Sequence, residues 1–469
     1  MSGTYVSPLA ERYASREMLR LFSPDTRYRT WRRLWIVLAR QERRLGIRRI
    51  TAAALRDLEA HAEKIDYAAV RRYEERLRHD VMAHIRAYED QAPRARGIVH
   101  LGATSMYVVD NTDLILMREA FGILRKELVN VVDALARFAE RHADLPVVAF
   151  THFQPAQFTT LGKRACLWIQ DLLLDLDELE ERSRSLRFLG AKGATGTQAG
   201  FLALFDGDAS KVRRLDEAVT RALGFERSYR VTGQTYPRKV DAQAHAALAG
   251  IAISAHKFAN DLRLLQHLGE VLEPFGKEQV GSSAMAYKRN PVLSERMTSL
   301  ARLVIVLSQN AAFTAASQWF ERTLDDSAGK RIAMPEAFLA TDAVLRLYLQ
   351  IVSGLVVRPE AIRARVDREL PAIATENILM EAVRAGGDRQ ALHERIRRHA
   401  AEGGGKDLLE RLERDGAFRA VRGRLRRLMR PEEYVGCAPL QVREFLRAEV
   451  RPRLRRCRGL LGLKPEVRV

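Results

Sequence analysis

The chain has 469 residues, of which 47% are hydrophobic and 29% charged, with a formal net charge of +19. This length allows a large core and two or three domains. Three scattered cysteines are too few for a disulfide framework or a zinc site. Since no run of 18 uncharged apolar residues and no apolar N-terminal signal are present, we expect a soluble, untargeted protein in a reducing cytoplasm.

The positive charge would attract nucleic acid, an anionic membrane or an anionic substrate. Much of it is arginine spread over polar helix faces, as at Arg422, Arg424 and Arg430. A general arginine bias explains that pattern equally well, and no nucleic-acid motif with interleaved aromatic residues accompanies it. We therefore expect no membrane partner and treat nucleic acid as an improbable one.

Apolar residues recur at intervals of three and four along almost every long segment, whereas alternating strand patterns are scarce. The sequence thus predicts an all-α protein. Changes in helix length divide it into an N-terminal helical domain (1–104), a central domain of long helices (105–357) and a C-terminal helical domain (358–469). The last has shorter helices and glycine-rich turns at 386–387 and 403–405.

Two motifs mark the first domain. An irregular arm at residues 7–15 contains Arg12 and Tyr13, which composition alone would interpret as a packed N-terminus. A helix predicted over 67–88 carries Arg78 and His79, a pair of cations suited to phosphate, beside Asp80, which could hold a ring or a guanidinium. A solvated charged face explains these three residues about as well.

Long helices dominate the central domain, predicted over 113–143, 157–189, 237–268, 291–318 and 331–357. Helices of this length indicate a long bundle or one shared between subunits. Residues 246–255 are apolar on nearly every side, so we expect them to be buried all round, as in the middle of an oligomer.

The connections carry the polar residues of interest. Thr104 and Ser105 precede the first long helix with donors suited to a carboxylate. His152 lies in a connection where its imidazole could face a cavity, although a lone loop histidine is more often structural. Gln234 offers an amide donor, and Arg322 and Arg331 offer charge.

The stretch 281–291, with the sequence Gly-Ser-Ser-Ala-Met-Ala-Tyr-Lys-Arg-Asn-Pro, reads as a closable loop ahead of a helix that carries Glu295 and Arg296. Gly281 permits unusual backbone angles, and small neighbours let backbone N–H groups approach an anion. Together with the connections, the loop supplies a histidine, a serine, cations and neutral donors, but no metal cluster, Walker loop or dinucleotide fingerprint. This inventory fits removal of a proton next to a carboxylate, because only preorganised donors and cations stabilise the dianion that forms.

The motifs that carry these residues resemble, in order, those of the adenylosuccinate lyases, in the animal-type branch of that family and within the fumarase/aspartase superfamily. They include L-R-H-D-V-M-A-H (77–84), T-H-F-Q-P-A-Q (151–157), the loop just described and W-F-E-R-T-L-D-D-S (319–327). The resemblance implies cleavage of adenylosuccinate to AMP and fumarate, and of the succinyl-aminoimidazole-carboxamide ribotide to its carboxamide product and fumarate. It implies no cofactor and no metal.

Matched position by position, the resemblance makes His152 the general acid, Ser282 the general base and Glu295 the carboxylate that orients the histidine. Ligands of the succinyl carboxylates would be Lys288, Asn290, Thr104 and Ser105. Contacts to the phosphate and nucleotide would be Arg12, Tyr13, Arg78, His79, Arg322, Ser327 and Arg331, with Gln234 and Arg296 as further substrate contacts.

The resemblance also implies a homotetramer whose active sites are each assembled from three chains. Ala286 stands where the family usually has proline, so we expect a loop that is more mobile when open. The enzymatic alternatives are argininosuccinate lyase and fumarase, but their substrates have no phosphate for Arg78 and His79 to hold. A basic nucleic-acid-binding scaffold that has kept the fold is the alternative of another class; it would tolerate loss of His152 and Ser282, yet both are present.

Overall fold

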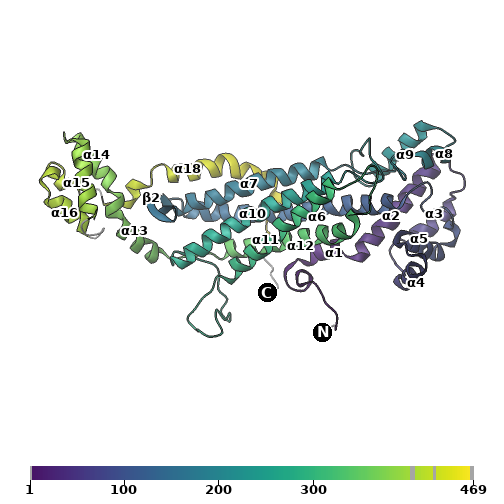
Figure 1. The fold of residues 1–469 in the computed structure, drawn as a ribbon, viewed down its shortest axis with the longest axis horizontal. Helices are drawn as coiled ribbons and strands as arrows, with labels where there is room; N and C mark the ends of the chain where they lie inside the picture. Colours follow the sequence, from purple (N-terminus) through teal and green to yellow (C-terminus); the bar gives the residue numbers. More distant parts are fainter. Residues whose placement is uncertain (1–2, 402–406, 426–428, 465–469) are drawn as a thin grey trace.

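The structure is a computed structural model that describes residues 3–401, 407–425 and 429–464, so the predicted glycine turn at 403–405 lies outside the described residues. These residues form a long, predominantly helical rod (Figure 1). The all-α prediction is confirmed, with two small two-stranded sheets added: β1 (Pro146–Thr151) with β2 (Gln154–Thr160), and β3 (Val271–Leu272) with β4 (Val356–Val357).

The helices of the first 104 residues gather at one end of the rod (Figure 1). They are α1 (Arg16–Leu21), α2 (Pro24–Arg44), α3 (Ala52–Ala60), α4 (Tyr67–Leu77) and α5 (Asp80–Gln91). The hydrophobic core here also takes in residues from the segment between Phe188 and Tyr236, which contains α8 (Ala199–Leu204) and α9 (Ala209–Ala222). Part of the predicted central domain therefore packs on the N-terminal helices. The domain boundaries themselves stay a prediction.

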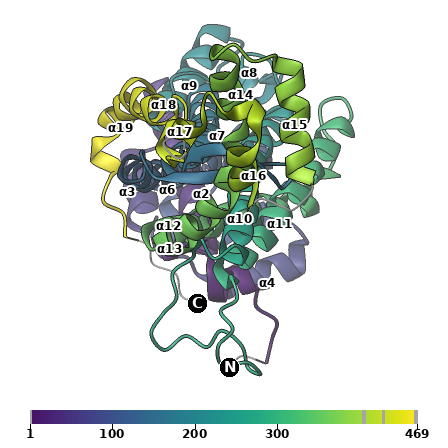
Figure 2. The same cartoon turned by 90° about the vertical axis from the view of Figure 1, so that its left-hand side faces the viewer.

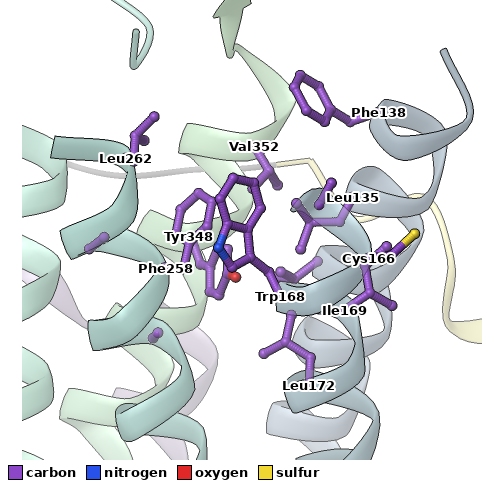
Figure 3. Packing of buried hydrophobic residues seen from close by; sticks show 14 of the residues in the cluster. Leu135, Phe138, Cys166, Trp168, Ile169, Leu172, Phe258, Leu262, Tyr348 and Val352 are labelled. Atoms are coloured by element: carbon purple, nitrogen blue, oxygen red, sulfur yellow. The ribbon is translucent and has the colours of Figure 1, made fainter. Parts of the chain in front are cut away.

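Five long helices form the middle of the rod: α6 (Ser105–Arg141), α7 (Leu161–Ser185), α10 (Lys239–His267), α11 (Val292–Ala316) and α12 (Asp326–Ser353). Their packing centres on aromatic side chains (Figure 3). The Trp168 ring meets Phe258 edge-on at 5.0 Å, and Phe258 stacks on Tyr348 at 4.3 Å. The Trp168 indole N–H donates to Asp261 at 2.7 Å, which satisfies the polar atom of an otherwise apolar anchor.

At the other end of the rod lie the helices that follow residue 358 (Figures 1 and 2). They are α13 (Pro359–Ile373), α14 (Thr375–Arg384), α15 (Arg389–Ala401), α16 (Leu408–Arg414) and α17 (Arg422–Leu425), whereas α18 (Ala438–Phe445) and α19 (Arg451–Arg456) lie back along the bundle. The chain after α17 returns along the bundle. There the Asn130 side chain, in the middle of α6, donates to the Leu460 carbonyl and accepts from the N–H groups of Gly462 and Leu463.

The single helix predicted over 67–88 is wrong, because the chain breaks between α4 and α5. Arg78 adopts a left-handed conformation with φ of 53°, and the His79 ring accepts a hydrogen bond from the Met82 N–H to cap α5. The break lets α5 fold back so that Val70 of α4 packs near Ala83 and Ala87 of α5. Leu77, the last residue of α4, is 39% exposed.

The helix predicted from residue 157 begins only at Leu161, and the residues before it form a β-hairpin. Pro155 disfavours helix for the residue before it and removes a donor, so Gln154–Thr160 pairs as a strand with Pro146–Thr151. The Thr160 hydroxyl then accepts from the Lys163 N–H and starts α7. The four other predicted long helices exist, with ends shifted by a few residues.

Within one chain, residues 246–255 are not buried on every side, since Ile253 is 56% exposed, and their predicted burial in an oligomer stays a prediction. Apolar side chains also face outward from neighbouring long helices, among them Leu174 of α7, Val306 and Phe313 of α11, and Ile332 of α12. By length and composition α11 could cross a membrane, and 17% of its most apolar stretch is buried within the chain. Core helices of water-soluble assemblies share that composition.

A buried ion network joins the heads of α6, α10 and α12. The Arg238 guanidinium donates to both carboxylate oxygens of Asp110 at 3.0 Å and to Asp326 at 2.6 Å. Nearby, Lys330 lies 2.9 Å from Asp113 and donates to the Tyr236 hydroxyl at 2.7 Å. Burial alone would raise the pKa of Asp113, but Lys330 and Arg27 lower it to about 2, so this carboxylate stays ionised.

Removing one member of this network should destabilise the fold strongly. In Asp110→Ala the Arg238 charge stays buried without its bidentate carboxylate partner. This loss costs about 3–5 kcal/mol of unfolding free energy. Denaturant unfolding at fixed protein concentration measures the loss. The control is Glu217→Ala in α9, where the ion pair with Arg221 is solvent-exposed and its loss costs less than about 1 kcal/mol. Equal losses in the two variants would contradict the role given to the network.

Candidate active site

The break between α4 and α5 brings several predicted phosphate ligands to one place. The His79 ring lies 3.5 Å from the Ser105 hydroxyl, at the start of α6, and the Asp80 carboxylate accepts from Arg331 of α12 at 2.7 Å. Burial would raise the pKa of Asp80, but the Arg331 hydrogen bond and the Val81 N–H lower it overall. Asp80 therefore stays ionised and holds the Arg331 guanidinium beside His79.

Thr104 lies next to this group, and its hydroxyl does not cap α6. It occupies the N-cap position of α6, yet its side chain makes no capping hydrogen bond, unlike the hydroxyls that start α1, α2 and α7. The first N–H groups of a helix point outward and attract anions. Thr104 and Ser105 thus present hydroxyl and backbone donors in one direction, as a carboxylate requires.

The N-terminal arm, residues 7–22, places two further predicted residues against α11. The Arg296 guanidinium lies 5.8 Å from the centre of the Tyr13 ring, and the Arg12 guanidinium lies 6.0 Å from the same ring. Arg12 points into solvent, whereas Tyr13 is half-buried. Two cations flanking one aromatic face form a positively charged surface on which a planar, negatively charged ligand could rest.

Gln234 holds a junction of loops together. Its backbone N–H donates to the Glu321 carbonyl at 2.9 Å, and its side-chain amide donates to the Ala194 carbonyl at 3.0 Å. Gly233 lies so close to this chain that an added Cβ would come within 2.4 Å of the Glu321 oxygen. The neighbouring Arg322 donates to Asp326 at 2.9 Å, which joins the loop to the buried network. In the chain alone, the Gln234 amide is therefore occupied by backbone.

The loop that carries Ser282 projects from the body of the rod between α10 and α11, as both views show (Figures 1 and 2). Its base is closed by Asn290, whose side chain donates to the Gly281 carbonyl at 2.9 Å. The Ser282 hydroxyl accepts from the N–H groups of Ala284 and Met285. Lys288 is exposed. Two backbone donors aimed at one oxygen favour its anionic form, so the turn itself is suited to a serine base.

Glu295 lies in the first turn of α11, where the helix dipole favours a carboxylate. It lines an open hollow of about 620 Å³ together with His267, Arg289 and neighbouring residues. The start of α11 is fixed beneath it by Glu273, which accepts from the N–H groups of Leu293 and Ser294 at 2.9 Å each. This cap holds Glu295 in place at the foot of the projecting loop.

His152 occupies the turn of the β1–β2 hairpin, with both central residues in the left-handed region: φ is 52° at His152 and 56° at Phe153. Such values strain residues other than glycine and persist where the surroundings impose them, as the two paired strands do here. The tip is exposed, and within the described ranges the imidazole has no hydrogen-bond partner. It is presented outward, available to a group from outside its own chain.

One chain therefore joins His79 and Arg331 through Asp80 but does not bring the whole predicted set together. The hairpin with His152 and the α4–α5 junction with His79 lie toward opposite ends of the rod (Figure 1). Among the residues that the structure describes, no contact joins His152 to Ser282 or Glu295. Sequence reasoning missed Lys330 and Arg238, which bind the buried carboxylates at the start of α6 and α12; for Lys330 the signal was the density of charge around 325–331.

No group of three or more histidine, cysteine or acidic side chains in the described part of the chain has the arrangement of a metal site.

Comparison with known proteins gives a consistent family. Residues 38–306 match a family model described as "Lyase", and residues 371–445 match one described as "Adenylosuccinate lyase C-terminus". The chain is 51% identical to the adenylosuccinate lyase of Saccharomyces cerevisiae, over 95% of each protein, and 44% identical to that of Schistosoma mansoni, over 99% of each.

Solved structures show the same fold in enzymes of other specificity. A 3-carboxy-cis,cis-muconate lactonizing enzyme from Pseudomonas putida superposes with a TM-score of 0.83 at 24% identity, covering 96% of this chain and 99% of the other. A fumarate lyase from Mesorhizobium gives 0.82 at 24% identity, covering 96% and 100%. At this identity the likeness shows the fold alone.

Gly281 should be indispensable for the geometry of the loop. A Cβ there would lie 2.1 Å from the Lys288 carbonyl oxygen, so Gly281→Ala must separate the two arms of the loop and displace Ser282. Since displacement by about 1 Å can cost about a hundredfold in rate, we expect kcat/KM to fall by about that factor without loss of unfolding free energy. Gly276→Ala in the same segment is the control, because its Cβ meets nothing closer than 3.5 Å. Equal activity in both variants would refute this role.

Proposed function

The chain belongs to the adenylosuccinate lyase family, and on that premise we propose how its residues perform the reaction. The enzyme is a carbon–nitrogen lyase that releases fumarate from adenylosuccinate, giving AMP, and from succinyl-aminoimidazole-carboxamide ribotide, giving the carboxamide ribotide, in purine nucleotide biosynthesis. The observation that carries this function is the similarity to adenylosuccinate lyases over nearly the full length. The residue roles are our proposal.

In this mechanism Ser282 takes the proton from the carbon next to the distal succinyl carboxylate. The electron pair left on that carbon spreads into the carboxylate, so a dianion develops that must be stabilised by fixed donors. Lys288 and Asn290 of the loop and Thr104 and Ser105 at the start of α6 provide those donors. The electron pair then forms the double bond of fumarate as the carbon–nitrogen bond breaks.

His152 gives its proton to the departing nitrogen as the general acid. An imidazole suits this task because its ordinary pKa lies near neutrality. Glu295, contributed by another chain, would pair with the imidazolium and orient it, much as a carboxylate orients the histidine of a catalytic triad. The exposed position of both side chains supports this arrangement, since each is presented outward from its own chain.

A serine base requires help, because a free hydroxyl ionises far above neutral pH. The two backbone N–H groups on Ser282 favour the alkoxide, and Lys288 lies on the same loop. Closure of the loop over the substrate would expel water and strengthen both effects. The projecting loop is the open form in this proposal, and binding of the succinyl group closes it.

The nucleotide end is held by charges. We place Arg78, His79 and Arg331 around the phosphate, with Ser327 in the first turn of α12 and Arg322 in the loop before it. Arg12, Tyr13 and Arg296 would lie against the nucleoside. Bidentate arginine contacts suit phosphate oxygens. Asp80 is a ligand of Arg331 here and reaches the substrate only through it.

We propose that four copies assemble and that each active site takes residues from three of them. The outward apolar side chains of α7, α10, α11 and α12 support this assembly, because large exposed apolar faces mark contact surfaces. The same packing accounts for the apolar composition of α11. The described cysteines are unpaired, which agrees with the reducing cytoplasm that we propose as the location.

The reaction is tested by an ultraviolet assay with adenylosuccinate that identifies AMP and fumarate as products. The native chain should turn over, whereas Ser282→Ala should retain substrate binding and lose at least about a thousandfold in kcat, because the proton acceptor is gone. Ser283→Ala, on the adjacent serine, is the matched control and should stay active. An active Ser282→Ala enzyme would exclude the serine base.

Shared active sites are tested by mixing two inactive variants. If His152 and Ser282 of one site come from different chains, tetramers reassembled from equal amounts of His152→Ala and Ser282→Ala contain some fully native sites, up to about a quarter when subunits mix at random. Activity should therefore reappear after mixing under conditions that exchange subunits. Each variant exchanged with itself is the control, and no recovery in a mixture shown to contain hybrids would contradict the arrangement.

A further inference from the structure

The N-terminal arm is fastened to the bundle by a buried carboxylate that has no part in the mechanism above. The Ser15 N–H donates to one Asp342 oxygen at 2.6 Å, and the Ser15 hydroxyl donates to the other at 2.7 Å. Asp342 lies in the middle of α12 and is 0% exposed. The same hydroxyl accepts from the Met18 N–H at 3.1 Å and so starts α1. One carboxylate thus fixes both the entry of the chain and the first turn of α1.

Asp342 lies next to a cation and a second buried carboxyl group. The Arg346 guanidinium donates to Glu127 at 2.8 Å and lies 3.5 Å from Asp342, so one cation faces two buried carboxyl groups. Burial, followed by the charge of Asp342, raises the pKa of Glu127 well above its usual range. Arg346 therefore faces both carboxyl groups, and the two Ser15 donors add to it at Asp342. Hydrogen bonds to a buried charged acceptor are stronger than those to a neutral one.

Apolar contacts alone would leave the direction of the arm open. Leu9, Ala14 and Met18 are buried against α6 and α12 and hold the arm to the bundle, but such contacts are not directional. The two hydrogen bonds from Ser15 are directional, and they act two residues after Tyr13. They thereby decide where the Tyr13 ring meets Arg296.

We propose that Asp342 is a positioning residue for substrate binding: by fixing Ser15, it orients Arg12 and Tyr13 toward the nucleotide. The proposal rests on the function proposed above, in which the arm contacts the nucleotide and not the succinyl group. Asp342 touches neither substrate nor reacting atoms. Its loss should weaken the binding of every ligand that carries the nucleotide and leave the elimination step unchanged.

The variant Asp342→Asn tests this, because it preserves the volume but places an amide donor opposite one of the two Ser15 donors. KM for adenylosuccinate and the inhibition constant of AMP should each rise about tenfold, which is the effect of losing one strong hydrogen bond. The kcat should stay within about twofold, and inhibition by fumarate should not change. Thr341→Val, on the adjacent and equally buried residue, is the control, since its hydroxyl bonds only within α12.

A milder pair of variants covers the case in which Asp342→Asn does not fold. Ser15→Ala removes one bond to Asp342 together with a helix cap, whereas Ser23→Ala removes the cap of α2 and local bonds to Arg20 and Thr26 but no bond to Asp342. The AMP inhibition constant should rise in Ser15→Ala, stay native in Ser23→Ala and recover in Ser15→Thr. Hydrogen exchange of the arm, measured without substrate, should accelerate in Ser15→Ala alone.

The outcomes separate the two proposals. An active native enzyme whose Ser15 and Asp342 variants keep native affinity for AMP would overturn the positioning role only. A fall in kcat with unchanged KM would overturn it as well, because the arm would then act on the chemical step. An inactive native chain would overturn the proposed function, and arm exchange would still report whether Asp342 anchors Ser15.

Discussion

Arg238 and its acidic partners have almost no access to water, and this burial constrains everything around them. A buried charge is tolerated only when it is paired and hydrogen-bonded, so the heads of α6, α10 and α12 can meet in only one register. That register decides where α12 starts and therefore where Arg322, Ser327 and Arg331 point. The aromatic packing along the rod stabilises the bundle, but packing alone would tolerate small slips that the ion network does not allow.

The sequence predicted the architecture well, because helical periodicity is strong in helices this long. It failed where short-range signals oppose that periodicity. The break at Arg78 and His79 depends on a left-handed residue and a histidine cap, neither of which has a distinctive sequence signal. The β-hairpin around His152 was not predicted, because only one of its two strands alternates between apolar and polar residues, although Pro155 was a visible signal against a helix. Apolar patterning also could not say which faces pack within the chain and which face outward, as Ile253 shows.

The candidate residues were recognisable from their motifs, but their relations were not. The bond from Arg331 to Asp80 joins residues far apart in the chain, and no pattern within either motif indicates it. The separation of His152 from the loop of Ser282 was likewise invisible in sequence. The residues of the proposed chemistry lie in turns, a loop and helix ends, while the long helices hold these segments rigidly apart. This arrangement agrees with the occurrence of one fold in enzymes with different activities.

The return of the C-terminal segment to Asn130 has a consequence for how the chain is made. Three backbone groups near the end of the chain complete the hydrogen bonds of a side chain in the middle of α6, more than 300 residues earlier. Contacts of such sequence separation form late and slow the folding of a domain. During synthesis, therefore, α6 leaves the ribosome long before its last partner does. Until residues 460–463 have been made, the apolar face of α6 around Asn130 stays uncovered, and in that interval the bundle would depend most on molecular chaperones.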